Sequence, residues 1–257
     1  MKMPRLALIL LVAGMGLAGC ERAATPSGPS ASTSPTGQWL KTISSNGGVG
    51  SSFPIPVPPS AEPGDVFVAS ILALPSNDED RVATPDGWTY VRNTQHNWLY
   101  VHVVTGEEPP AYVWTYEQIG PKEAMGVIMV FDGVDPEDPV ESSSGLFLNQ
   151  DQLVNTPGNG TPVASILAPS VDVGVPGSLV LYSAACHIRS IDGLPINDIV
   201  PPPGMTEIAD LRDKGQFELA YMVKPDAGPT GDLVGSSNAV SIHAVGSLVV
   251  LRPAADR

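Results

Sequence analysis

The chain has 257 residues, is 42% hydrophobic and carries a formal net charge of −14. This much negative charge repels nucleic acid and anionic lipid headgroups, so neither is expected as a direct partner. Its 27 prolines and 26 glycines separate short apolar runs, which is typical of an all-β protein with many turns. The composition therefore favours a globular all-β protein of one domain or a tightly fused pair.

The N-terminus has the layout of a secretory signal peptide. Lys2 and Arg5 precede an apolar run, residues 6–13, that is shorter than the about 20 residues a membrane-spanning helix needs. The tetrapeptide Leu17-Ala18-Gly19-Cys20 resembles the lipobox of bacterial lipoproteins. The resemblance implies that residues 1–19 are a cleaved signal peptide and that Cys20 is lipidated and becomes the new N-terminus.

The lipid attachment predicts where the protein works. Several acyl chains hold a protein firmly to a bilayer, whereas one gives only marginal binding. Glu21, in place of an aspartate after Cys20, favours the outer membrane or cell surface over the inner membrane. Cleavage takes the net charge from −14 to −16, because Lys2 and Arg5 leave with the signal. Cys186 is then the sole remaining thiol, so no intramolecular disulfide is expected.

Residues 21–37 contain no large apolar side chain and are rich in Ser, Pro, Gly, Thr and Ala. Such a segment cannot bury enough surface to fold, so we expect a flexible linker. Residues 38–257 are expected to form the β-sandwich domain. Short apolar runs bounded by turn residues predict strands at residues 53–57, 65–74, 88–94, 97–104, 111–116, 124–134, 163–167, 171–173, 178–187, 205–211, 216–223, 232–234 and 239–251.

Two series of these strands resemble one another in order and spacing. The offset grows from 113 to 117 to 120 residues along the chain, in the matched positions Gly64/Gly177, Gly87/Gly204, Leu99/Leu219 and Phe131/Leu251. This predicts an internal repeat with halves at about residues 50–140 and 160–253. With about five strands in each half, we expect the halves to pair face to face as one antiparallel sandwich around one core.

The segments PGDVFVA, PDGWTYV, LYVHVV, YVWTY and VFDGV resemble a sandwich domain of uncharacterised bacterial surface proteins and phage tail-associated proteins. The resemblance spans most of residues 60–253 and consists of turns and core strands. It implies a jelly-roll-like fold and brings no catalytic residue with it.

Motifs for catalysis and for metal binding are absent from the sequence. There is no G-x-S-x-G nucleophile elbow and no H-E-x-x-H zinc motif. The histidines His96, His102, His187 and His243 are scattered along the chain; two can converge in the fold, but ordinary hydrogen-bonded histidines are the favoured interpretation. The pair Glu107-Glu108 before two prolines indicates a solvated turn more than an acid/base pair. We therefore expect no catalytic residue and no metal ligand.

Acidic loops leave calcium open as an alternative. Residues 77–80 (Asn-Asp-Glu-Asp) and 132–138 concentrate the hard oxygen ligands that Ca²⁺ prefers. Neither loop fits the EF-hand pattern. The favoured interpretation is a solvated acidic loop without a cofactor.

Tyr112, Trp114 and Tyr116 alternate with smaller residues, so their rings lie on one face of a strand. An exposed row would form a stacking platform for sugar rings, and these three residues are the candidate ligand-binding residues. A buried row is core, and since aromatic residues are only 6% of the chain, the core needs most of them. Where the three rings point decides between the two.

The sequence therefore predicts a non-enzymatic, membrane-anchored cell-envelope lipoprotein. Its sandwich is expected to act in binding, in adhesion or as a structural module, with a glycan or a protein as ligand. The alternative is an envelope enzyme acting on polysaccharide, a glycoside hydrolase or lyase, with a pair of carboxylates across a cleft.

Overall fold

The computed structural model describes residues 39–74, 82–116, 122–149, 164–188, 199–212, 215–237 and 241–255. Cys20, the linker 21–37 and the acidic loop 77–80 lie outside these ranges. Within them every regular element is a strand and every strand pair is antiparallel, which confirms the predicted all-β class. No helix in the described ranges is long and apolar enough to span a bilayer.

Eight strands come from the first half of the chain and ten from the second. The first eight are β1 Leu40–Gly50, β2 Ser52–Pro56, β3 Val66–Leu74, β4 Val82–Ala83, β5 Thr89–Thr94, β6 Asn97–Val103, β7 Ala111–Tyr116 and β8 Lys122–Phe131. The others are β9 Val140–Asn149, β10 Ala164–Ala168, β11 Asp172–Val173, β12 Ser178–Ile188, β13 Ile199–Val200, β14 Thr206–Arg212, β15 Gln216–Lys224, β16 Gly228–Pro229, β17 Leu233–Ser237 and β18 Ser241–Leu251.

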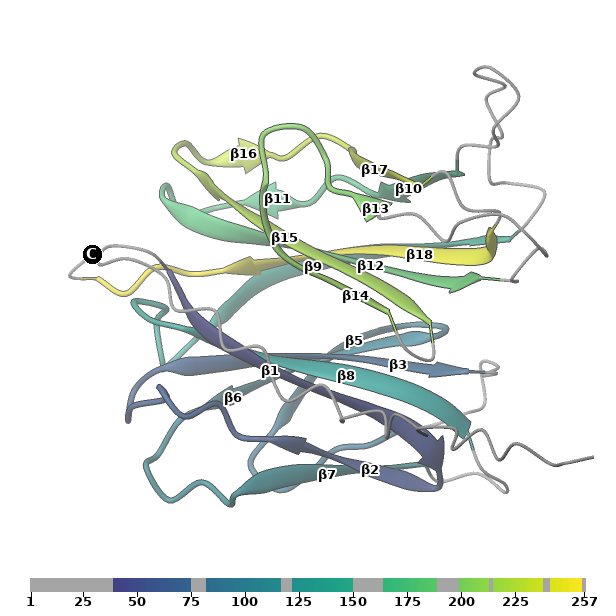
Figure 1. The fold of residues 1–257 in the computed structure, drawn as a ribbon. Coiled ribbons are helices and arrows are strands. Elements are labelled where there is room, and N and C mark those ends of the chain that lie inside the picture. Colours follow the sequence, from purple (N-terminus) through teal and green to yellow (C-terminus); the bar gives the residue numbers. More distant parts are fainter. Residues whose placement is uncertain are drawn as a thin grey trace, which may run out of the picture.

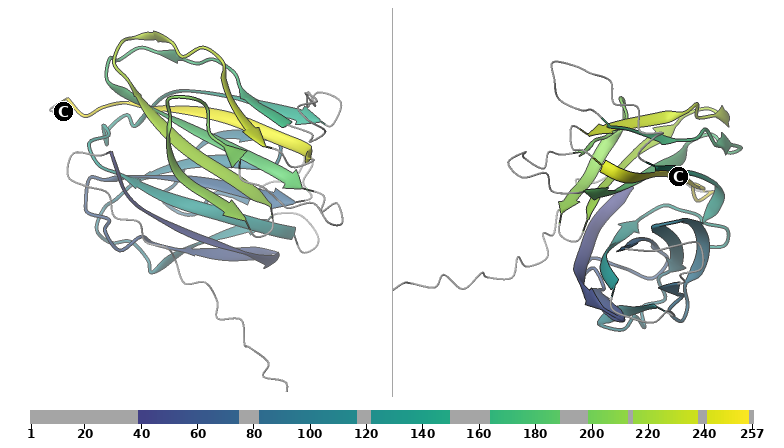
Figure 2. Two further views of the ribbon diagram at one scale, coloured as in Figure 1. Left: turned by 45° about the horizontal axis from the view of Figure 1, so that its top comes forward. Right: turned by 90° about the vertical axis from the view of Figure 1, so that its right-hand side faces the viewer.

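Sixteen of these strands form four stacked sheets (Figure 1). The two inner sheets have five strands each, in the orders β1-β8-β3-β6-β5 and β14-β15-β12-β18-β9. The two outer sheets have three, in the orders β2-β7-β4 and β10-β17-β13, and β11 pairs separately with β16. Each half of the chain thus supplies one inner and one outer sheet, and the two halves lie against each other through their inner sheets (Figure 2).

The two halves share one strand order. Strands β9, β10, β12, β13, β14, β15, β17 and β18 occupy the places of β1, β2, β3, β4, β5, β6, β7 and β8. The chain passes repeatedly between the two sheets of a half, as in a jelly roll. A register shift between Tyr90 and Arg92 has its counterpart between Glu207 and Ala209. Duplication of the halves stays a prediction, which this shared order supports.

The halves begin with β1 and β9, earlier than the expected boundaries at residues 50 and 160. Both strands are rich in Ser and Gly and lie at a sheet edge, with sequences LKTISSNGGVG and VESSSGLFLN. Neither was among the predicted strands, because a strand with few large apolar residues lacks the usual alternating signal.

Three large hydrophobic clusters replace the single core that was predicted. One lies between the inner sheets, and each half has another between its inner and outer sheets. Strand β3 illustrates the cause, since Val66 and Val68 face the other half while Phe67 and Ala69 face the outer sheet of their own half. The single-core prediction was wrong because it placed the predicted strands in two sheets. In the structure β2, β7, β10 and β17 belong to separate outer sheets, which let each half bury both faces of its inner sheet.

Polar side chains lie in the middle of the inner interface. The hydroxyl oxygens of Ser70 and Ser183 are 3.0 Å apart, and Asn97 donates from Nδ2 to Ser183 Oγ at 3.0 Å. Ser70 and Ser183 occupy matching positions on β3 and β12 and are fully buried. Contact between matching positions is what an approximate two-fold relation between the halves produces. The hydrogen bonds satisfy groups that would otherwise destabilise the interface.

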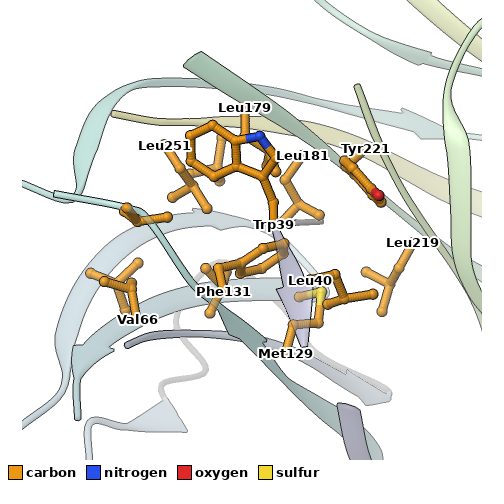
Figure 3. Close-up of a cluster of buried hydrophobic side chains, with 14 of the residues drawn as sticks. Trp39, Leu40, Val66, Met129, Phe131, Leu179, Leu181, Leu219, Tyr221 and Leu251 are labelled. Carbon is orange, nitrogen blue, oxygen red and sulfur yellow. The ribbon is translucent and has the colours of Figure 1, made fainter. Parts of the chain in front are cut away.

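Trp39 closes one edge of the inner interface. Its indole lies among side chains of the second half, including Leu181 and Leu251 (Figure 3). Only 7% of Trp39 is exposed. Because the residue precedes β1, it holds the start of that strand at the edge of the inner interface.

Replacing Trp39 with alanine removes a large buried side chain from this interface. We expect Trp39→Ala to lower the free energy of unfolding by about 3–5 kcal/mol, measured by chemical denaturation. The exposed Val223→Ala on β15 is the control and should change it by less than about 0.5 kcal/mol. A loss below about 1 kcal/mol for Trp39→Ala would show that the indole does not close the interface.

Candidate functional site

The aromatic row of β7 is core and offers no stacking platform. Tyr112, Trp114 and Tyr116 are 6%, 0% and 7% exposed. They face the inner sheet of the first half, while Val113 between them is 53% exposed. These three residues were therefore wrong as ligand-binding candidates. The alternation was correctly identified, but the outer position of the β2-β7-β4 sheet turns the ring-bearing face inward.

Tyr112 belongs to a buried polar cluster with His102 and Glu108. His102 Nδ1 lies 2.7 Å from the carbonyl oxygen of Gly87, and Nε2 lies 3.0 Å from Glu108 Oε2. The Tyr112 hydroxyl donates to the same Glu108 oxygen. The Tyr112 hydroxyl also lies 3.1 Å from His102 Nε2, so the three side chains form one hydrogen-bonded cluster.

The Glu108 carboxylate also fixes the loop between β6 and β7. Burial raises its pKa, but hydrogen bonds from Tyr112, Thr105 and His102 outweigh burial and lower the pKa to about 2. Burial and the same carboxylate raise the pKa of Tyr112. The expectation of a solvated turn holds for the exposed Glu107 but not for Glu108. Side-chain exposures of 8% for His102 and 10% for Glu108 make this cluster an internal anchor for the loop.

The described acidic loop has its own internal partners. In residues 132–138, Asp135 Oδ1 accepts from the amide of Glu137, and Asp138 pairs with Arg252 at 2.9 Å. Among the described side chains no group of three or more His, Cys, Asp or Glu residues is arranged to hold a metal ion. Calcium stays an open alternative to the favoured solvated loop, since residues 77–80 lie outside the described ranges.

Glu218 is a buried carboxyl group on β15. It is 0% exposed, and neither carboxyl oxygen has a hydrogen-bond partner among the described residues. Burial, together with the nearby carboxylates of Glu207 and Asp210, raises its pKa to about 9. At neutral pH Glu218 is therefore protonated. The side chain lies on β15 of the second half.

An open groove lies where β5 of the first inner sheet faces β9 of the second. It encloses about 420 Å³ and is lined by Thr89, Tyr90, Val91, Val101, Glu137, Asp138, Pro139, Val140, Ser142 and Ser143. Tyr90 is 53% exposed, and its ring meets Tyr100 edge to face at 5.9 Å between centroids. The exposed side chains of Glu137 and Asp138 add carboxylates. The groove thus combines an aromatic surface, hydroxyl groups and negative charge.

A difference between the two halves leaves this groove open. Leu40 pairs with Phe131 as Val140 pairs with Leu251, so Pro139 stands where the first half has Trp39. Trp39 fills the interface at its edge, and the smaller Pro139 lines the groove at the other edge. The guanidinium of Arg92 donates to the carbonyl oxygen of Ser143 at 2.8 Å and ties β5 to β9 beside the groove.

Sequence reasoning missed this groove. Matching the strands of the two halves places the large Trp39 opposite the small Pro139. The groove could be predicted only if β1 and β9 were recognised as matching strands, and the apolar pattern did not identify either strand.

Replacing Glu218 with glutamine removes the titrating group. Between the ordinary pKa of about 4.5 and the folded value of about 9, the unfolded chain releases the Glu218 proton and the folded chain keeps it. Native stability should therefore fall by about 1.4 kcal/mol per pH unit over this window relative to Glu218→Gln. Urea unfolding at pH 5, 6, 7 and 8 measures the slope, with the exposed Glu123→Gln as control. Parallel curves for the wild type and Glu218→Gln would contradict a buried neutral carboxyl.

Comparison with known proteins finds no matching family model, no matching curated protein and no matching solved structure. The geometry of the groove and of the buried clusters is therefore the basis on which function is argued.

Proposed function

We propose that this protein is a lipid-anchored lipoprotein of the cell envelope that binds a carbohydrate in the groove between β5 and β9. The single observation that carries the ligand proposal is that the lining of one groove includes the half-exposed Tyr90 together with Glu137 and Asp138. Lipid attachment at Cys20 rests on the lipobox-like tetrapeptide. The linker 21–37 then stands the folded domain off from the bilayer.

The groove suits a sugar in size and chemistry. Small-molecule sites commonly enclose about 300–1,000 Å³, and the groove at about 420 Å³ falls within that range. An exposed tyrosine ring offers a flat apolar surface to the C–H face of a sugar ring. Carboxylates accept hydrogen bonds from sugar hydroxyls, and such charge-assisted bonds are stronger than neutral ones.

The arrangement of carboxylates favours binding over glycoside hydrolysis. Hydrolysis needs two carboxyl groups on opposite sides of the scissile bond, about 5–10 Å apart. In this groove Glu137 and Asp138 are neighbours on one wall, and Asp138 is paired with Arg252 at 2.9 Å. The facing wall presents Thr89, Tyr90 and Val91, which hold no carboxylate.

The Tyr90 ring is the test of the binding site. A screen of glycans and bacterial polysaccharides on the full-length protein should find a ligand whose affinity falls about tenfold or more in Tyr90→Ala, measured by calorimetry. Val113→Ala, at an equally exposed position on β7, is the matched control and should bind as the wild type does. A ligand that binds both variants equally, or no ligand at all, would refute the groove as a carbohydrate site.

The anchor is tested separately. Cys20→Ala should abolish lipidation, because alanine has no thiol to which a lipid can be attached. Without acyl chains the protein should be released from membranes. Membrane fractionation and the intact mass of the mature protein measure this. Retention of Cys20→Ala in the membrane, or a wild-type mass without added lipid, would contradict the anchor without bearing on the groove.

A further inference from the structure

Two histidines from opposite halves of the chain meet at the end of the inner interface. His96 lies in the turn between β5 and β6, and His243 lies on β18. Their ring centroids are 5.5 Å apart, with 36° between the ring planes. The ring of Phe147 on β9 packs against both, at 5.4 Å from His96 and 5.3 Å from His243.

The pair is accessible at one side and enclosed at the other. His96 is only 7% exposed, whereas His243 and Phe147 are partly exposed to solvent. A solute can therefore reach the rings from the His243 side. The Phe147 ring gives the pair an apolar wall, and a lower local dielectric strengthens bonds between an ion and its ligands.

The separation of the two rings suits one shared metal ion. A zinc–nitrogen bond is about 2.0–2.1 Å, so two imidazoles on one tetrahedral ion have centroids about 5 Å apart. The 5.5 Å observed needs only a small side-chain adjustment. Imidazole is a preferred ligand of Zn²⁺, Cu²⁺ and Ni²⁺, while Ca²⁺ and Mg²⁺ prefer oxygen.

We propose that His96 and His243 bind Zn²⁺, with water completing the coordination, and that the ion joins the two inner sheets. Within the described residues, these two imidazoles are the protein ligands that the proposal assigns to the ion. This proposal is independent of carbohydrate binding.

An ion at this place would cross-link the two halves of the chain, which the two cysteines cannot do. Cys186 is a free, buried thiol, and Cys20 is the proposed lipid attachment residue. Of the two ligands, His96 belongs to the first half and His243 to the second. An ion that binds the folded interface but not the unfolded chain stabilises the interface by mass action.

The test is a zinc titration of the full-length protein without a histidine tag. Calorimetry in millimolar Ca²⁺, which blocks adventitious binding to carboxylates, should show one Zn²⁺ per chain and a higher Tm with zinc. Affinity should fall about tenfold or more in His96→Gln and in His243→Gln. It should also fall between pH 7.5 and pH 5.5, because the ligand imidazoles must lose their protons.

Phe147→Leu is the matched control, since it disturbs the ring packing but keeps both imidazoles. Zinc binding retained in Phe147→Leu and lost in His243→Gln supports a metal site. The proposal is overturned if the wild type takes up no stoichiometric zinc, or if His243→Gln binds zinc as tightly as the wild type. Should His96→Gln fail to fold, the partly exposed His243→Gln decides the outcome alone.

Discussion

Burial of both faces of the two inner sheets is the constraint on which the rest of the structure depends. Strands β3 and β12 pass through the middle of these sheets, with one set of side chains in the central cluster and the alternate set against an outer sheet. Such strands must be apolar on both faces. This explains near-continuous runs such as Val66–Leu74. It also explains why the buried Ser70 and Ser183 must hydrogen-bond to each other.

The residues proposed to be functional lie at positions where the two halves, which share one strand order, differ in sequence. Trp39 seals the inner interface at the β1 edge, and Pro139 in the matching position leaves the groove at the β9 edge. His96 and His243 likewise lie at non-matching positions, one in a turn and one on a strand. Both proposed sites therefore lie at positions that occur once in the fold, although the two halves share one strand order.

The sequence was sufficient to predict strands, which depend on the local pattern of apolar residues. It was insufficient to predict which faces of the sheets pack against one another. Alternation in residues 111–116 correctly predicted β7, but the direction of the Tyr112, Trp114 and Tyr116 rings depends on which sheet β7 joins and which face of that sheet is buried. The alternation specifies neither. The edge strands β1 and β9 were missed for lack of large apolar residues. The groove and the histidine pair could not be predicted, because each joins segments far apart in the chain.

The placement of the groove also fits the proposed anchor. Strand β1, which follows Trp39, is one edge of the first inner sheet, and β5 is the opposite edge. A linker that joins the domain at Trp39 therefore attaches across the sheet from Tyr90. On the proposed function, a membrane-tethered domain of this topology presents its groove on the side away from the attachment point.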